Sequence, residues 1–285
     1  MDELNMHADI ELLSQSGKTI QHYFFQGLDV YYNSIKDWRI WIYMAFTDIR
    51  RRYQRTIIGP FWVTLSIAIF IGTMGVVFPV LWHTNVKTYL PFFASGFIMW
   101  TFVSSVTSEA CGTFVDASGL IKQTSLSYSV YANNVVTRNV IVMFHHLSVY
   151  LIVMLVFRVP VNLNTLLFIP GMIILCLTSS WICVLFGLFA SRFRDIKQVV
   201  SSLLQVSMFV TPIFWEPSQL GSGRKAQLLI SANPLHHFIQ IARAPLLGQA
   251  PVMIDWMMSI AICAVGWLMT IIILGKYRKH LVFWL

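Results

Sequence analysis

Long apolar runs alternate with short polar segments along most of this 285-residue chain. Six runs have roughly the 20 residues that a helix needs to cross ~30 Å of hydrocarbon. They cover residues 61–82, 90–115, 134–157, 163–190, 197–215 and 253–275. In lipid the backbone must satisfy its own hydrogen bonds, which favours helices over irregular chain. The pattern therefore predicts an all-α integral membrane protein with six transmembrane helices.

The polar region before the first run contains one stretch of helical spacing, residues 37–53. One side of this stretch is apolar and carries Trp38, Ile42, Phe46, Ile49 and Tyr53. An amphipathic helix of this kind lies in the membrane interface, or packs against a partner's soluble domain. Ahead of it we expect a cytoplasmic N-terminal tail, residues 1–36, whose first 18 residues are loose. The loop that follows the helix ends at residue 59, and the membrane domain occupies residues 60–285.

Two longer polar connections depart from a plain bundle. Residues 116–134 have a short amphipathic core, which predicts a short helix across the cytoplasmic face. Residues 215–251 hold apolar pieces too short to cross, separated by prolines. Such pieces predict short re-entrant helices between the fifth and sixth spans.

Charge sets the orientation of the chain. Only 11% of its residues are charged, against 56% hydrophobic, which excludes an ordinary soluble domain. The net charge of +8 would suggest nucleic acid in a soluble protein, but most of the 20 Lys and Arg residues flank apolar runs. They concentrate on segments that share one side if both termini are cytoplasmic, as the positive-inside rule requires. We therefore expect contact with anionic membrane lipids and no nucleic-acid partner.

Signs of catalysis or nucleotide binding are weak. Residues 16–19 read S-G-K-T, but Leu12 stands where a phosphate-binding loop would have its first glycine. The histidine pairs 145–146 and 236–237 are adjacent and so point to different faces, which favours packing or local hydrogen bonds over metal binding. No catalytic residue, metal site or cofactor is predicted. Glu109 and Arg138, near the ends of neighbouring spans, are expected to form an ion pair, with a substrate contact as the alternative.

Two of the predicted spans carry a face that could line a passage through the membrane. On the first span an i, i+4 row holds Trp62, Ser66, Phe70, Met74 and Phe78. On the fifth, a polar face holds Gln198, Ser201, Ser202, Gln205 and Phe209. Polar groups in a membrane helix face protein or a water-filled path. The alternatives are a groove for an amphipathic molecule, whose sugars would stack on rings, and helix packing through Ser and Gln.

Several motifs together resemble one known family. They are R-R-R-Y-Q-R-T-I-I-G-P-F-W (50–62), G-L-I-K-Q-T-S-L-S-Y-S-V-Y (119–131), S-R-F-R-D-I (191–196), T-P-I-F-W (211–215) and N-P-L-H-H-F-I-Q-I-A-R-A-P-L-L-G (233–248). The chain resembles the permease subunit of a type-2 ABC exporter of the Wzm type, which moves O-antigen and related polysaccharides. The likeness covers residues 37–285, and the first 36 residues are not explained by it.

The resemblance implies a homodimer in the bacterial inner membrane that docks on two separate ABC ATPase subunits, which bind ATP and Mg. The substrate would be an undecaprenyl-pyrophosphate-linked polysaccharide. Its pyrophosphate would enter past Arg50, Arg51, Arg52, Arg55, Ile58 and Gly59. The first and fifth spans would line the channel, with Trp62, Ser66, Phe70, Met74, Phe78, Ser201, Gln205 and Phe209. Coupling to the ATPase would use Gly119, Leu120, Ile121, Lys122, Gln123, Leu126 and Tyr128, and residues 216–247 would form an outer gate.

One departure and three rivals qualify this reading. The sequence L-S-Y-S at 126–129 replaces the L-P-x-S pattern expected in the coupling segment, which shifts the expected helix start by a residue or two. A related permease could carry teichoic acid, capsule polysaccharide or a lipid instead. A membrane glycosyl- or acyltransferase would be active without an ATPase, and an ion channel would conduct alone.

Overall fold

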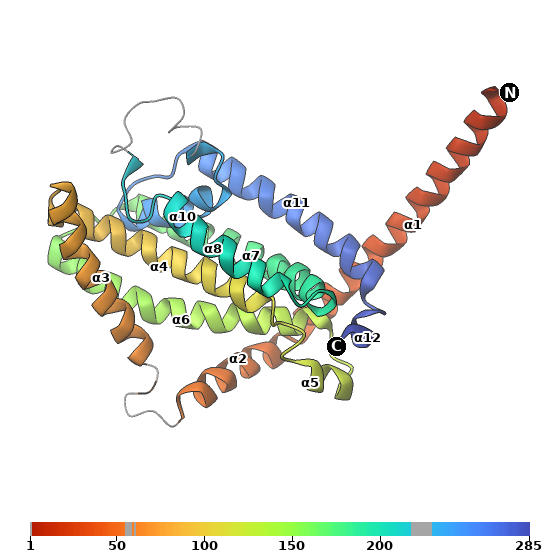
Figure 1. Ribbon diagram of the computed structural model, residues 1–285, viewed down its shortest axis with the longest axis horizontal. Helices are drawn as coiled ribbons and strands as arrows, with labels where there is room; N and C mark the ends of the chain where they lie inside the picture. The colour runs from red at the N-terminus through yellow and green to blue at the C-terminus, as the bar shows by residue number, and fades with distance from the viewer. Residues whose placement is uncertain (1, 55–58, 60, 218–229) are drawn as a thin grey trace.

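All regular structure in the described part of the chain is helical. The computed structural model describes residues 2–54, 59, 61–217 and 230–285, with side chains of the first segment described from residue 19. The helices are α1 (Asp2–Lys36), α2 (Trp38–Tyr53), α3 (Phe61–Trp82), α4 (Val86–Ala110), α5 (Ser118–Gln123), α6 (Tyr128–Phe157), the 3-10 helix η1 (Leu163–Leu167), α7 (Phe168–Arg192), α8 (Ile196–Val210), α10 (Pro234–Leu246), α11 (Met253–Tyr277) and α12 (Leu281–Trp284) (Figure 1).

Five helices among the described residues are long and apolar enough to cross a membrane. They are α3, α4, α6, η1 with α7, and α11. The described part of this multi-pass membrane protein is therefore all-helical, as the apolar runs predict. The expected span at 197–215 differs, because α8 has only 15 residues. At 1.5 Å per residue it extends about 22 Å, short of the hydrocarbon thickness.

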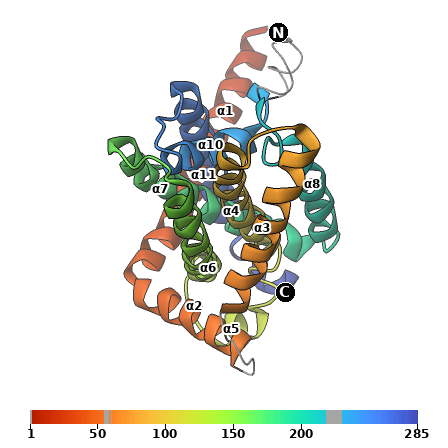
Figure 2. The same ribbon diagram turned by 90° about the vertical axis from the view of Figure 1, so that its left-hand side faces the viewer.

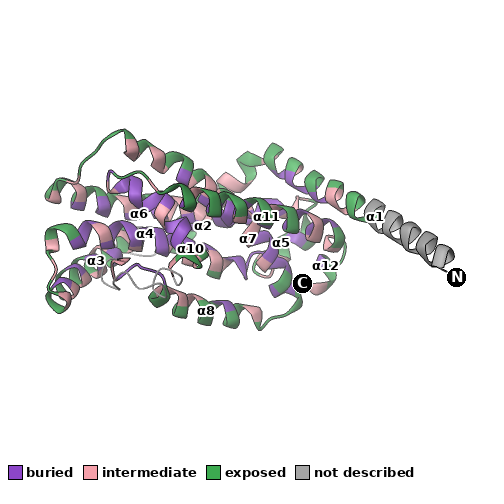
Figure 3. Ribbon diagram, turned by 90° about the horizontal axis from the view of Figure 1, so that it is seen from above, coloured by how far each residue is buried: buried purple, intermediate pink, exposed green. Residues whose placement is uncertain are grey.

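Helix α4 forms the centre of the bundle. In its most apolar window 67% of the residues are buried, against 22% for α3. Helices α6 and α7 pack on α4 and on each other, and α11 packs on α7. Helices α3 and α8 lie on the same outer side of the bundle (Figure 2). Buried residues concentrate in the middle of the bundle, whereas α8 is largely exposed (Figure 3).

The N-terminal region differs from the loose tail that its composition suggests. Residues 2–36 form the single helix α1, whose C-terminal half packs against α11. Two glycines permit this approach: a Cβ at Gly27 would overlap the carbonyl oxygen of Ile271, and one at Gly275 would overlap that of Tyr23. Small residues let two helix backbones come this close in a membrane protein. Tertiary packing thus holds the C-terminal half of α1 against the bundle.

The amphipathic helix predicted for residues 37–53 exists as α2, but its apolar face is divided. Ala45 and Ile49 are buried against the bundle, where α2 packs on α6. Trp38 and Phe46, which the sequence pattern assigns to the same face, remain exposed. The helix is rotated so that Asp48 also faces α6. A polar contact, treated below, accounts for this rotation.

The two polar connections are only partly as expected. The short helix in 116–134 is α5, and it has just six residues. Tyr128 begins α6 and does not belong to the short helix, because the chain is extended at Thr124 and at Ser127, the residue before α6. Between α8 and α11 the described part holds α10, preceded by the helical residues 230–231. Asn233 caps α10 by accepting the backbone N–H of Leu235 at 3.0 Å, with Pro234 in the first turn.

We expect Gly275→Ala to lower the free energy of unfolding by about 1–3 kcal/mol, because the new methyl group would displace α1 from α11. Thermal unfolding in detergent measures the change. Gly72→Ala is the matched control, since no atom lies within 4 Å of a Cβ at that position. A Gly275→Ala protein as stable as the Gly72→Ala control would contradict the close α1–α11 packing.

Candidate functional site

Arg138 of α6 binds two carboxylates from two other helices. Its Nη2 donates to Glu109 Oε2 of α4 at 2.8 Å, and its Nη1 donates to Asp48 Oδ2 of α2 at 3.1 Å. The Arg138 side chain is 16% exposed. The planar guanidinium offers donors in fixed directions, which suits two acceptors at once. The predicted Glu109–Arg138 ion pair is confirmed, and Asp48 is a partner that sequence reasoning missed.

Two asparagines and a second arginine complete the network. Asn139 Nδ2 donates to Glu109 Oε2 at 2.8 Å, and Asn134 Nδ2 donates to Asp48 Oδ2 at 3.0 Å. Arg52 Nη2 lies 3.4 Å from Glu109 Oε1. Asn134 and Arg138 are four residues apart on α6, so both face α2. The two guanidinium groups balance the two carboxylates, which makes the network neutral overall.

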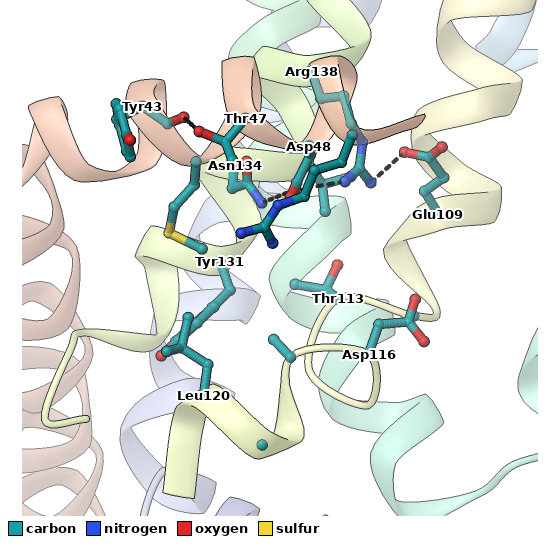
Figure 4. A pocket seen from close by; sticks show the side chains of 16 residues that line it. Tyr43, Thr47, Asp48, Glu109, Thr113, Asp116, Leu120, Tyr131, Asn134 and Arg138 are labelled. Carbon is teal, nitrogen blue, oxygen red and sulfur yellow. Dashed lines mark hydrogen bonds and ion pairs between the residues drawn. The ribbon is translucent and has the colours of Figure 1, made fainter. Parts of the chain in front are cut away.

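A cleft of about 520 Å³ opens beside this network. It lies between α2, the end of α4, α5 and the start of α6 (Figure 4). Arg51 lines it together with Asp48, Glu109 and Arg138, and its other walls carry Tyr43, Thr113, Asp116, Leu120, Tyr131 and Asn134. The cleft therefore joins the arginine-rich end of α2 to the short helix α5.

The arginine-rich segment is only partly within the described residues. Arg50, Arg51 and Arg52 occupy the last turn of α2, and all three are exposed. Cations in the last turn of a helix also complement its dipole. Arg55 and Ile58 lie outside the described residues. Gly59 has a φ of +62°, a left-handed conformation that glycine adopts without strain.

The residues expected to contact an ATPase divide into two groups. Gly119, Leu120, Lys122 and Gln123 are exposed on α5. Ile121 of the same helix is buried, and Leu126 and Tyr128 are half-buried against the core. The first group forms the most exposed part of this region. Ile121 packs α5 on the core, whereas Leu126 lies in the connection after α5 and Tyr128 begins α6.

The row of residues expected to line a channel on α3 is also divided. Trp62 and Ser66 are exposed, whereas Phe70, Met74 and Phe78 are half-buried. The Phe70 ring stacks on Phe97 of α4 with centroids 4.5 Å apart. The Phe78 ring lies 5.5 Å from that of Phe214, which belongs to the segment after α8. On α8, Ser201, Gln205 and Phe209 are all exposed.

Arg243 of α10 is a buried cation that the sequence did not indicate. Its Nη1 donates to the carbonyl oxygen of Pro212 at 2.7 Å, its Nε donates to Gln240 Oε1 at 2.8 Å, and its guanidinium lies 4.3 Å from the Phe92 ring centre. Burial lowers the pKa of Arg243 to about 10, so the side chain stays protonated at neutral pH. It ties the segment after α8 to α10 and α4.

The histidine pairs serve local structure and helix contacts. His145 Nδ1 lies 2.8 Å from the carbonyl oxygen of Ile141 on the preceding turn, a local hydrogen bond of the kind expected. His237 Nδ1 lies 2.7 Å from Asp255 Oδ1 of α11. His237 therefore links α10 to α11, a contact between segments that adjacency in sequence could not indicate.

Known proteins resemble this chain over most of its length. A family model described as "ABC-2 type transporter" matches residues 37–247. A Myxococcus xanthus protein named "O-antigen export system permease protein RfbA" is 21% identical over 189 residues, covering 66% of this chain and 72% of the relative. A Klebsiella pneumoniae protein of the same name is 22% identical over 196 residues, covering 67% and 74%. The match to the family model begins at residue 37, one residue before α2, so α1 lies outside the region that the family model covers.

The charge network allows a graded stability prediction. Arg138→Met should lower the free energy of unfolding by about 1.5–3 kcal/mol, because Glu109 and Asp48 would lose their shared partner in a partly buried site. Arg52→Met is the matched control. Its side chain is 50% exposed, so its loss should cost about 1 kcal/mol or less. Thermal unfolding in detergent compares the two, and equal losses would contradict the central role of Arg138.

Proposed function

The chain belongs to the ABC-2 type transporter family, and from this premise we propose that it is the permease subunit of an exporter for an undecaprenyl-pyrophosphate-linked polysaccharide such as O-antigen. Members of this family are membrane transport subunits and work with an ATPase partner. The observation that carries the proposal is the family match over residues 37–247, the part of the chain that contains the arginine-lined cleft and α5. Relatives named as O-antigen export permeases support this cargo.

The proposed location is the bacterial inner membrane, with both termini in the cytoplasm. The last turn of α2, with its three arginines, and the short helix α5 border the same cleft, and α12 contacts α5, so these segments mark one end of the bundle. Positive residues are retained on the cytoplasmic side during insertion. We therefore assign this end to the cytoplasm, where an ATPase and its ATP are available.

The proposed transporter is a homodimer that encloses its channel between two copies of α3 and α8. Gln198, Ser201 and Gln205 are exposed on α8, and Trp62 and Ser66 are exposed on α3. Amide and hydroxyl groups facing lipid would lose hydrogen bonds to water, whereas a second copy and a hydrated polysaccharide can supply them. Exposed rings such as Phe209 offer flat faces to the sugar C–H groups.

The proposed entry point for the lipid pyrophosphate is the end of α2. Arg50 and Arg51 are exposed there, and Arg51 also lines the cleft. A guanidinium pairs with two phosphate oxygens at once, which a lysine does not do. Arg52 is less available because Glu109 holds it. Arg51 is therefore the principal candidate for head-group contact among the described arginines.

Coupling to the ATPase is proposed to use the exposed side of α5. Leu120, the third residue of this helix, is 39% exposed and also lines the cleft. Because α5 and Arg51 share one cleft, a displacement of α5 by the ATPase would alter the space beside the arginines. ATP binding in the partner would in this way control access of the head group to the channel.

Arg51→Ala together with Arg50→Ala is expected to reduce polysaccharide export at least several-fold while the protein remains inserted and bound to its ATPase, because the pyrophosphate loses its cationic contacts. Export is measured as polysaccharide reaching the periplasmic side of inverted vesicles or of cells. Arg39→Ala is the matched control, an exposed arginine at the opposite end of α2. Normal export by the double variant would remove the arginines from the mechanism.

Leu120→Glu is expected to abolish co-purification of the ATPase subunit, because a charge would replace the exposed apolar contact on α5. Thermal unfolding of the permease alone should stay unchanged, since the side chain is not part of the core. Leu120→Met, similar in volume and apolar, is the control that should retain the ATPase. If Leu120→Glu still retains the ATPase and supports its ATP turnover, α5 is not the docking element.

A further inference from the structure

Helix α1 has three distinct faces over residues 19–36. This helix lies outside the family match, and the proposed export mechanism assigns it no role. One face is buried on the bundle and a second is polar. A third is apolar and exposed. A helix with three such faces has three different neighbours, and the structure identifies the first two of them.

The buried face fixes the position of α1 beside a spanning helix. The Tyr31 ring lies 4.5 Å from the Trp267 ring centre, Gly27 abuts Ile271, and Tyr23 abuts Gly275. As residue numbers rise along α1 they fall along α11, so the two helices run antiparallel. The C-terminal half of α1 therefore lies alongside the last turns of α11, a helix long and apolar enough to cross the membrane.

The polar face turns toward the connection between α5 and α6. Asp29, Asn33 and Lys36 line a pocket of about 560 Å³ together with that connection. From the adjoining buried face, the carbonyl oxygen of Val30 accepts the hydroxyl of Ser127, and Ser34 Oγ accepts Asn133 Nδ2 at 3.1 Å. This side of α1 is accordingly open to water at the end of the bundle that carries α5.

The third face is a stripe of large apolar side chains spaced three, four and three residues apart. Its members are Phe25 (68% exposed), Leu28 (38%), Tyr32 (60%) and Ile35 (66%). The spacing keeps them on one side of the helix. At the same level along the shared axis, α11 exposes Val265, Leu268 and Met269, which are apolar as well.

We propose that this stripe is a lipid-contact surface, with phospholipid acyl chains as its occupant in the leaflet at the α5 end. The antiparallel packing on α11 gives the stripe the depth of a spanning helix, so its apolar surface is continuous with that of the span. Two cations flank the C-terminal end of the stripe: Lys36 Nζ is 4.4 Å from the Tyr32 ring centre, and the Arg39 guanidinium is 5.4 Å from that of Trp38. Such side chains lay their stems on apolar surface and reach anionic phosphates.

The position of α1 favours lipid over a second copy of the chain. Helix α1 lies on the side of the bundle away from α8 (Figures 2 and 3). A dimer formed across α3 and α8 therefore leaves the stripe uncovered. Lipid contact would hold α1 at a fixed depth, and α1 in turn would hold the α5–α6 connection through Ser127 and Asn133. The N-terminal helix would thus set the height of α5 relative to the membrane.

Site-specific photocrosslinking tests the stripe. The photoreactive residue p-benzoylphenylalanine replaces Phe25 or Tyr32, both aromatic and exposed, in the full-length protein. The probe membrane is a nanodisc of phosphatidylethanolamine and phosphatidylglycerol. After irradiation, mass spectrometry should detect lipid adducts at both positions. Asp29, on the polar face only one residue beyond Leu28, is the matched control and should give several-fold less lipid adduct.

Three results would overturn the proposal. Adducts between two protein chains at 25 and 32 would identify a protein as the occupant. No adduct with lipid or protein at these positions would mean that the stripe faces water. Equal lipid adducts at 25, 29 and 32 would remove the sidedness on which the inference depends. The experiment needs no ATPase and no export, so its failure is distinguishable from failure of the proposed function.

Discussion

A guanidinium near the end of a membrane helix needs partners, and Arg138 obtains them from two other helices. Glu109 lies 2.8 Å away on α4 and Asp48 lies 3.1 Å away on α2. In a medium of low dielectric, an isolated charge is costly, whereas a paired and hydrogen-bonded charge is tolerated. Asn134 and Asn139 occupy further acceptor positions of the same carboxylates. The network joins α2, α4 and α6 at one end of the bundle.

The orientation of α2 follows from this requirement. Asp48 must face α6, which turns Ala45 and Ile49 into the protein and leaves Trp38 and Phe46 outside. The same rotation directs Arg51 into the cleft and brings Arg52 to Glu109. Arginines that are neighbours in sequence thereby acquire different tasks. Arg52 pairs with Glu109 in the charge network, whereas Arg51 lines the cleft beside α5.

The opposite end of the bundle depends on a second buried cation. Arg243 gathers Pro212, Gln240 and the Phe92 ring, and Gly96 of α4 leaves the space that its side chain occupies. Between the two ends, aromatic rings from α3, α4 and the segment after α8 stack on each other, as Phe70 and Phe97 do. The outer helices α3 and α8 keep exposed polar groups. We attribute those groups to contact with a second copy and with the cargo.

The apolar runs by themselves determined that the chain is helical and crosses the membrane, because span length and hydrophobicity are properties of a continuous segment. The Glu109–Arg138 pair could also be predicted, because both residues lie near the ends of consecutive apolar runs. Only the tertiary structure decided that α8 ends after 15 residues, that Asp48 joins Arg138, and that the C-terminal half of α1 packs on α11. Each of these depends on residues distant in sequence: Gly27 meets Ile271, and Arg243 meets Pro212. Local spacing carries no information about which distant backbone or charge will supply the missing partner.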